Sequence, residues 1–276
     1  MKKFKYLIFI MCFFHWIIYG YTTATVESVA GVRNFVSGVE SVFNNPAFIT
    51  NIKGNQSMLD YKKYFFVSSE QNVDGYTPAD ISNILFATKF DLGKNFGCGL
   101  GIGSLIVPNF YNETKFVFAG GYKHDFEIVK FFIAGQVSSK FIDFFSSEYD
   151  KTKKFYINTY IAIEYKNFVF TIIGEKIFKK TEDDEPVEFI SEITYKWFDK
   201  IFASFGLQTG RQIEPKLGVE WRLKESLFFR SGINNNEFSL GFGIKIKKIS
   251  LNISSVYPYN YFQPLPQVRT AIVYNW

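Results

Sequence analysis

The chain ends on Arg269-Thr-Ala-Ile-Val-Tyr-Asn-Trp276. Read in twos from the last residue, one series of side chains is Trp276, Tyr274, Ile272 and Thr270. Successive side chains of a β-strand point to opposite faces of its sheet. The sequence therefore predicts a terminal strand with one largely apolar face that ends on an aromatic ring.

The same alternation runs through the whole chain. In Glu237-Phe-Ser-Leu-Gly-Phe-Gly-Ile-Lys-Ile-Lys247, every second residue is a large apolar one. Runs of this kind repeat about 14 times at about ten residues each, which predicts an all-β fold, a transmembrane antiparallel up-and-down β-barrel. The expected spans are 57–68, 81–92, 96–107, 114–124, 127–142, 153–166, 168–178, 187–197, 201–210, 213–224, 226–233, 237–247, 249–256 and 266–276.

One expected strand, 168–178, breaks the alternation. Glu175 and Lys176 are adjacent, so a regular strand would turn one of these two charges toward lipid. A β-bulge near Gly174 would restore the pattern. The alternative fold for the whole chain is a soluble β-sandwich or lipocalin-like barrel, which would turn its apolar faces inward.

The beginning of the chain favours the membrane interpretation. Met1-Lys-Lys-Phe-Lys5 is basic, an apolar run reaches Tyr21, and Thr22-Thr-Ala24 offers small residues for cleavage. This pattern predicts a secretory signal peptide over residues 1–24. A single transmembrane anchor is the alternative, but the run is short for the ~20 residues that a span needs. We expect export to the bacterial outer membrane, with Ile272, Tyr274 and Trp276 as the assembly signal; the expected partners are outer-membrane lipid and the barrel assembly machinery.

Composition excludes several classes of function. Removal of three signal-peptide lysines lowers the formal net charge from +5 to +2, and no basic patch suggests a nucleic-acid partner. Cys98 and His124 are the only cysteine and histidine beyond residue 24, too few for a zinc cluster. His124 beside Asp125 falls at an expected short turn, away from any second catalytic group. We therefore expect no catalytic residues, no metal and no cofactor, and rank an enzyme as a distant third possibility.

The polar faces of the strands indicate what fills the barrel. Glycine occupies every second position from Gly97 to Gly103, which on an inward face leaves room for something beside it. Charges of both signs share these faces and predict a lumen filled by ion pairs rather than an open selective pore. The principal lumen-facing candidates are Lys130, Glu192, Glu220, Arg222 and Arg230.

Residues 25–55 precede the first expected strand and contain Ser41-Val-Phe-Asn-Asn-Pro-Ala47. With the Asn45-Pro46-Ala47 motif, the chain resembles the FadL superfamily of outer-membrane proteins, including its PorV/PorQ-like branch. The resemblance implies that 25–55 forms an N-terminal plug, or hatch, inside a barrel of residues 56–276. The chain is shorter than the fatty-acid transporters of that superfamily, which puts their large extracellular capture site in doubt and fits the PorV/PorQ-like branch better.

Two functions follow from the resemblance. The first is binding or passing small hydrophobic molecules across the outer membrane. The alternative is a non-transporting scaffold or accessory barrel for protein secretion or surface attachment, so the candidate partners are a hydrophobic small molecule or a secretion partner. The lumen should discriminate: an apolar pocket reaching the plug favours transport, whereas a lumen packed with ion pairs favours the scaffold.

Overall fold

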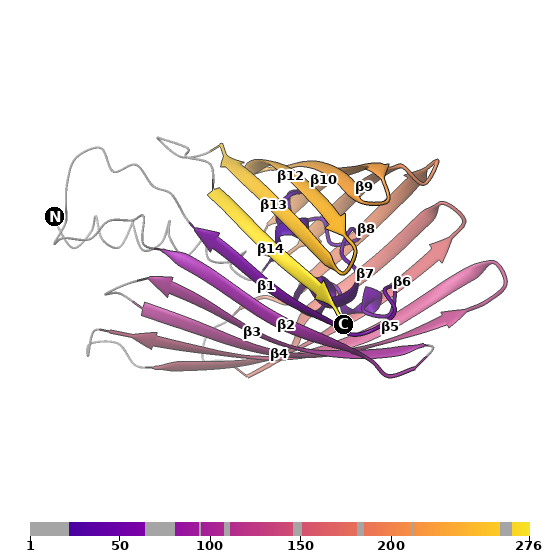
Figure 1. The fold of residues 1–276 in the computed structure, drawn as a ribbon. Coiled ribbons are helices and arrows are strands. Elements are labelled where there is room, and N and C mark those ends of the chain that lie inside the picture. Colours follow the sequence, from indigo (N-terminus) through magenta and orange to yellow (C-terminus); the bar gives the residue numbers. More distant parts are fainter. Residues whose placement is uncertain are drawn as a thin grey trace.

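Fourteen antiparallel strands close into one barrel in the computed structural model (Figure 1), which describes residues 22–63, 81–93, 95–107, 111–145, 151–180, 185–210, 212–259 and 267–276. Each strand pairs with its neighbours in the chain, and β1 pairs with β14 to complete the circle. The strands are β1 (Gln56–Lys63), β2 (Ser82–Asp91), β3 (Phe96–Val107), β4 (Tyr111–Asp125), β5 (Val129–Phe144), β6 (Thr152–Tyr165), β7 (Phe168–Lys180), β8 (Glu188–Trp197), β9 (Ile201–Thr209), β10 (Ile213–Lys224), β11 (Leu227–Asn234), β12 (Glu237–Ile246), β13 (Ile249–Pro258) and β14 (Gln267–Asn275). The predicted fold class is confirmed.

Apolar side chains cover the outside of the barrel. Leu100, Phe118 and Ile172 are more than half exposed, whereas Lys89 and Arg269, on the opposite faces of their strands, are fully buried. A soluble barrel would show the reverse arrangement. The outward apolar face is the one that a lipid bilayer requires.

The two ends of the barrel differ in their connections. At one end, which we call the short-turn end, β2 to β13 are joined in pairs by two to four residues, such as 166–167 and 247–248. Both Phe198 and Asp199 have positive φ there, as tight hairpin turns of the mirror-image types require. The other end, the long-connection end, holds the connections between β1 and β2, between β5 and β6 and between β13 and β14.

Aromatic rings gather on the outer surface near the short-turn end. Trp197, Trp221 and Trp276 are each about half exposed, and Trp276 Nε1 donates to Ser57 Oγ at 3.2 Å. Tyr122, Tyr165, Tyr195 and Tyr274 lie on the same outward face. Aromatic rings of this kind sit well at a membrane interface because each has an apolar body and a polar tip.

The predicted bulge is present in β7 and is confirmed. Thr159 of β6 pairs with Gly174, but the next pair is Ile157 with Phe178, so three β7 residues stand opposite Asn158 alone. Lys176 adopts a positive φ of 59°, and its backbone N–H donates to Asn158 Oδ1 at 2.8 Å. The irregularity turns both Glu175 and Lys176 toward inward-facing partners rather than lipid.

Residues 22–55, here called the N-terminal segment, lie inside the barrel. The segment contains α2 (Ala24–Glu27), η1 (Gly38–Glu40), α3 (Ser41–Asn44) and η2 (Pro46–Phe48). Almost all of its side chains between Thr22 and Ile49 are buried, and they contact the inward faces of strands from both halves of the barrel. Among the described residues, no helix has the length and hydropathy needed to cross a bilayer.

Candidate functional site

Glycines on the inward faces of β3 and β4 leave room for the second half of the N-terminal segment. A Cβ on Gly101 would lie 2.7 Å from Phe43 Cζ, and a Cβ on Gly121 would lie 2.5 Å from the Pro46 carbonyl oxygen. Real Cβ atoms almost never approach so closely, so these positions require glycine. The expectation that alternate glycines make room inside the barrel is confirmed at Gly97, Gly99 and Gly101.

A second group of glycines, on β10, β11 and β12, receives the first half of the segment. A Cβ on Gly218 would lie 3.0 Å from Val29 Cβ, and one on Gly232 would overlap the Val29 backbone. A Cβ on Gly241 would overlap the Ser28 side chain. The two halves of the segment are therefore seated on opposite walls of the barrel.

Apolar packing supplements these seats. Val42, Phe43 and Ile49 form one cluster with inward residues of β1, β2, β4 and β14. Ala47 and Phe48 form another with inward residues of β5 to β8, where the Phe48 and Phe132 rings meet edge to face at 5.4 Å. Buried apolar contact of this kind stabilises the seated segment in the way a small domain core does.

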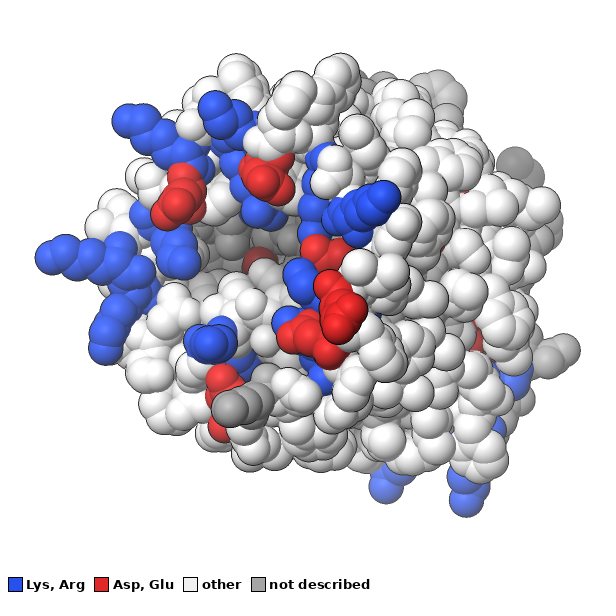
Figure 2. Space-filling model, turned by 90° about the vertical axis from the view of Figure 1, so that its right-hand side faces the viewer, with Lys and Arg blue, Asp and Glu red and all other residues white. Residues whose placement is uncertain are grey.

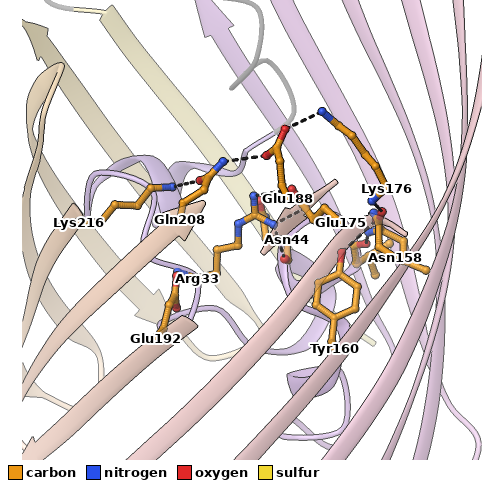
Figure 3. Close-up of polar contacts among 12 residues, drawn as sticks. Arg33, Asn44, Asn158, Tyr160, Glu175, Lys176, Glu188, Glu192, Gln208 and Lys216 are labelled. Atoms are coloured by element: carbon orange, nitrogen blue, oxygen red, sulfur yellow. Dashed lines mark hydrogen bonds and ion pairs between the residues drawn. The ribbon is translucent and has the colours of Figure 1, made fainter. Parts of the chain in front are cut away.

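The centre of the site is Arg33, which the β7 bulge brings into contact with Glu175 (Figure 3). Arg33 Nη1 and Glu175 Oε1 are 2.5 Å apart, and the second nitrogen and oxygen are 3.3 Å apart, so the pair is bidentate. On the other side, the backbone N–H groups of Arg33 and Asn34 both donate to the Glu192 carboxylate at 2.9 Å. Two strands therefore fix one turn of the segment through charge-assisted hydrogen bonds.

A belt of polar side chains continues along the barrel wall beside Arg33, as Figure 3 shows. Lys216 Nζ donates to Gln208 at 2.6 Å, Gln208 donates to Glu188 at 2.8 Å, and Lys176 donates to the other Glu188 oxygen at 2.7 Å. The belt links β10, β9, β8 and β7 in order. Lys176 and Glu188 form an ion pair, and the Lys216 ammonium group is hydrogen-bonded to the Gln208 amide, so each buried charge has a polar partner.

A second ion cluster holds the beginning of the segment. Glu27 pairs with Lys62 of β1, and Arg269 of β14 lies 3.5 Å from Glu27 and 3.2 Å from Asp60. The Asp60 carboxylate also accepts the backbone N–H of Ala24 at 2.9 Å. Two carboxylates thus meet two cations, which leaves the buried cluster electrically balanced.

A third network carries three of the residues singled out in the sequence. Glu220 accepts from Arg230 Nε and from Arg222 Nε, each at 2.7 Å. Arg230 continues to Asn252 at 3.0 Å, and Asn252 reaches Glu40 of the N-terminal segment at 3.4 Å. Glu220 and Arg230 are buried, whereas Arg222 is 39% exposed.

Lys130 and the motif residues occupy different surroundings. Lys130, at the short-turn end, pairs with Glu164 at 3.4 Å. Asn45, Pro46 and Ala47 are buried; the Asn45 backbone caps the turn before Pro46, and its side-chain amide has no hydrogen-bond partner among the described residues. Ile272, Tyr274 and Trp276 face outward.

Sequence reasoning missed Arg33, Glu175 and Glu27 as site residues. Arg33 and Glu27 lie in a stretch without strand periodicity, so the local sequence does not indicate which way their side chains point. Glu175 carried a usable signal, namely its conflict with Lys176 over one strand face, but that signal could not name its partner. Part of the second group of glycines could have been found, since Gly218 and Gly241 occupy the polar series of alternating strands.

An apolar patch occupies the inward face at the long-connection end of β3, β4 and β5. Its members are mutually packed, and the Tyr111 and Phe144 rings are 5.8 Å apart. We call it the entrance cluster; it consists of Ile81, Leu105, Val107 and Tyr111, with Ile142 and Phe144 against them. It lies closer to the long-connection ends of its strands than Gly97, Gly99 and Gly101, beside which the N-terminal segment is seated.

Glu185, in the connection between β7 and β8, predicts a pH effect. It pairs with Lys154 at 2.7 Å and Lys176 at 3.3 Å. Burial alone would raise the pKa of Glu185, but these ammonium groups outweigh it and lower that pKa to about 2. Because the ordinary value is about 4.3, the carboxylate stabilises the fold fully above pH ~4.3, and this contribution is lost as the pH falls toward 2.

We expect Glu185→Gln to remove that acid-sensitive contribution, about 1–2 kcal/mol given partial exposure. The measurement is the unfolding temperature from pH 6 to pH 2.5, read by heat-modifiable gel mobility. The wild type should lose more stability than the variant across this range. Parallel curves for the two proteins would contradict the assignment.

No protein-family model matches the chain, and no curated protein matches its sequence. Solved structures do match. The CymD monoaromatic hydrocarbon channel superposes with a TM-score of 0.67 at 10% identity, covering 92% of this chain and 97% of that one. The Pseudomonas putida toluene transporter TodX gives 0.60 at 8% identity, covering 91% and 97%. The outer membrane protein Omp33 of Acinetobacter baumannii gives 0.51 at 4% identity, covering 81% and 98%. At these identities the likeness establishes the fold, that of an outer-membrane β-barrel.

Proposed function

We propose that this protein is an outer-membrane barrel of the FadL superfamily type that binds small hydrophobic molecules at its long-connection end. The entrance cluster is the observation that carries the proposal. Where the inward wall does not contact the N-terminal segment it is largely polar, and this cluster is an apolar part of it. Small-molecule sites are lined mainly by such apolar and aromatic side chains. The shared fold of CymD, a monoaromatic hydrocarbon channel, and of TodX, a toluene transporter, supports this ligand class.

The N-terminal segment is proposed to act as a plug below this site. Its two halves are seated on opposite walls by glycine contacts and by three ion networks, so it reaches across the described interior from one wall to the other. Under this proposal, a bound molecule proceeds further only if the segment moves. The entrance cluster is itself buried, so a ligand would exchange one set of apolar contacts for another.

The test is the binding of an aromatic hydrocarbon to a variant of the entrance cluster. We expect Leu105→Asn to weaken binding of 4-fluorotoluene about tenfold or more, because it replaces apolar surface worth about 2 kcal/mol by an amide. Binding would be followed by fluorine NMR in nanodiscs, with empty nanodiscs as the blank. Ser138→Ala, on the same inward face of β5 but outside the cluster, is the matched control and should bind as the wild type does.

A second candidate function is the non-transporting scaffold of PorV/PorQ-like proteins. The ion networks around Arg33, Arg230 and Arg269 favour it, because a lumen locked by buried pairs resists passage. The same titration discriminates between the two. Saturable binding that Leu105→Asn abolishes supports the hydrophobic ligand, whereas equal binding to all variants and to empty nanodiscs supports the scaffold.

A further inference from the structure

The short-turn end of the barrel is hollowed at its centre, and charged side chains of both signs surround the hollow (Figure 2). From β8 to β12, inward residues of this end alternate between cations and aromatic rings on neighbouring strands. They are Lys196, Phe202, Arg222, Phe228 and Lys245. This end lies opposite the entrance cluster and takes no part in the hydrophobic site proposed above.

Arg222 is the cation of this group that lies over aromatic rings. Its guanidinium carbon lies 3.9 Å from the centre of the Phe202 ring and 5.8 Å from that of Phe228, so two rings support it. Nε is committed to Glu220, but the terminal nitrogens have no partner among the described residues. With 39% of the side chain exposed, a stacked guanidinium presents its remaining N–H groups to the hollow.

One further cation, Lys245, lies on the inward face near Arg222. It follows two residues after Gly243, which pairs with Phe228, the strand partner of Arg222. Lys245 is exposed and forms no ion pair within the described part of the chain. A register shift after Arg222 places Lys224 opposite Leu227 of the outward series, so Lys224 does not share this face.

The nearby inward carboxylates are already engaged. Glu220 serves Arg222 and Arg230, and Glu164 serves Lys130 and Lys196. Asp199 and Glu225 belong to the exposed turns themselves. An excess of positive charge therefore remains on the inward side of this mouth.

We propose that Arg222, with Lys245, forms an oxyanion-binding site at the short-turn mouth. A planar guanidinium fixed by stacking and by Glu220 suits two parallel hydrogen bonds to a phosphate or carboxylate group. Lys245 supplies further charge without fixed geometry. The group bound can belong to an anionic lipid headgroup or to a soluble anion, since both present the same oxygens.

Two probes test the site on the mature protein. Phosphatidylglycerol binding is measured by native mass spectrometry against a phosphatidylcholine background, and inorganic phosphate binding by the phosphorus NMR linewidth in phosphatidylcholine nanodiscs. We expect saturable binding of at least one probe, weakened tenfold or more by Arg222→Gln. Binding of phosphatidylglycerol alone identifies a lipid headgroup, and binding of phosphate identifies a soluble anion.

Three comparisons keep the result interpretable. Arg222→Lys keeps the charge but loses the planar pair of N–H donors. Its affinity for the anionic probe should therefore fall between those of the wild type and Arg222→Gln. Lys247→Gln removes an equally exposed charge from the neighbouring turn and should change binding less than twofold. Each variant is expected to fold, because Glu220 keeps its ion pair with Arg230 in all of them. Heat-modifiable gel mobility checks this. Absence of saturable binding in the wild type, or equal binding by Arg222→Gln, overturns the proposal.

Discussion

Replacement of Gly232 by leucine is expected to unseat the first half of the N-terminal segment. A Cβ at this position would overlap the backbone of Val29 and Ala30, and neither backbone can yield as a flexible side-chain end could. Overpacking of a rigid contact costs about 1–3 kcal/mol or more. We therefore expect hydrogen-exchange protection of residues 24–35 to fall about 10- to 100-fold.

Gly135→Leu is the matched control for this variant. Gly135 also lies within a strand, but a Cβ there would meet nothing within 4 Å. The control should leave protection of the N-terminal segment unchanged. If the segment is the plug, Gly232→Leu should also raise the ion conductance of planar bilayers; conductance and protection equal to those of Gly135→Leu would show that the seat does not hold the segment.

Loss of Arg33 is expected to produce the second large effect. Arg33→Gln leaves the Glu175 carboxylate in the barrel interior without its bidentate partner. Removing one member of a buried ion pair typically costs about 3–5 kcal/mol. The loss should appear as exchange of the amides near residue 33, together with a lower denaturant midpoint of the barrel if the segment and wall unfold as one unit.

The double variant Arg33→Gln/Glu175→Gln separates pairing from packing. It leaves no uncompensated charge, so it should be less destabilised than either single variant, with a coupling energy above about 1 kcal/mol. Lys151→Gln breaks the exposed pair with Asp143, whose side chains are 76% and 54% exposed, and should change stability by less than about 0.5 kcal/mol. If the effects of Arg33→Gln and Glu175→Gln on stability simply add up in the double variant, direct pairing of Arg33 with Glu175 is contradicted.

These two predictions depend on parts of the molecule that the sequence revealed to different degrees. The alternation in 237–247 placed β12 within one residue of its observed end, and the conflict between Glu175 and Lys176 located the bulge. Strand ends were less accurate: β4 begins at Tyr111, three residues before the expected start, because its first residues continue the pairing with β3 although their polarity suggests a loop. The expected extension of β1 to residue 68 lies outside the described residues beyond Lys63.

The sequence by itself determined the approximate number of strands and which residues of each strand share a face. It could do so because a period of two is a local property, written into every ten-residue run. The tertiary structure alone decided which inward charge meets which. Arg33 and Glu175 are separated by 142 positions, and Arg269 and Glu27 by more than 200, so their contacts exist only once β14 has closed on β1 around a segment that has no period of its own.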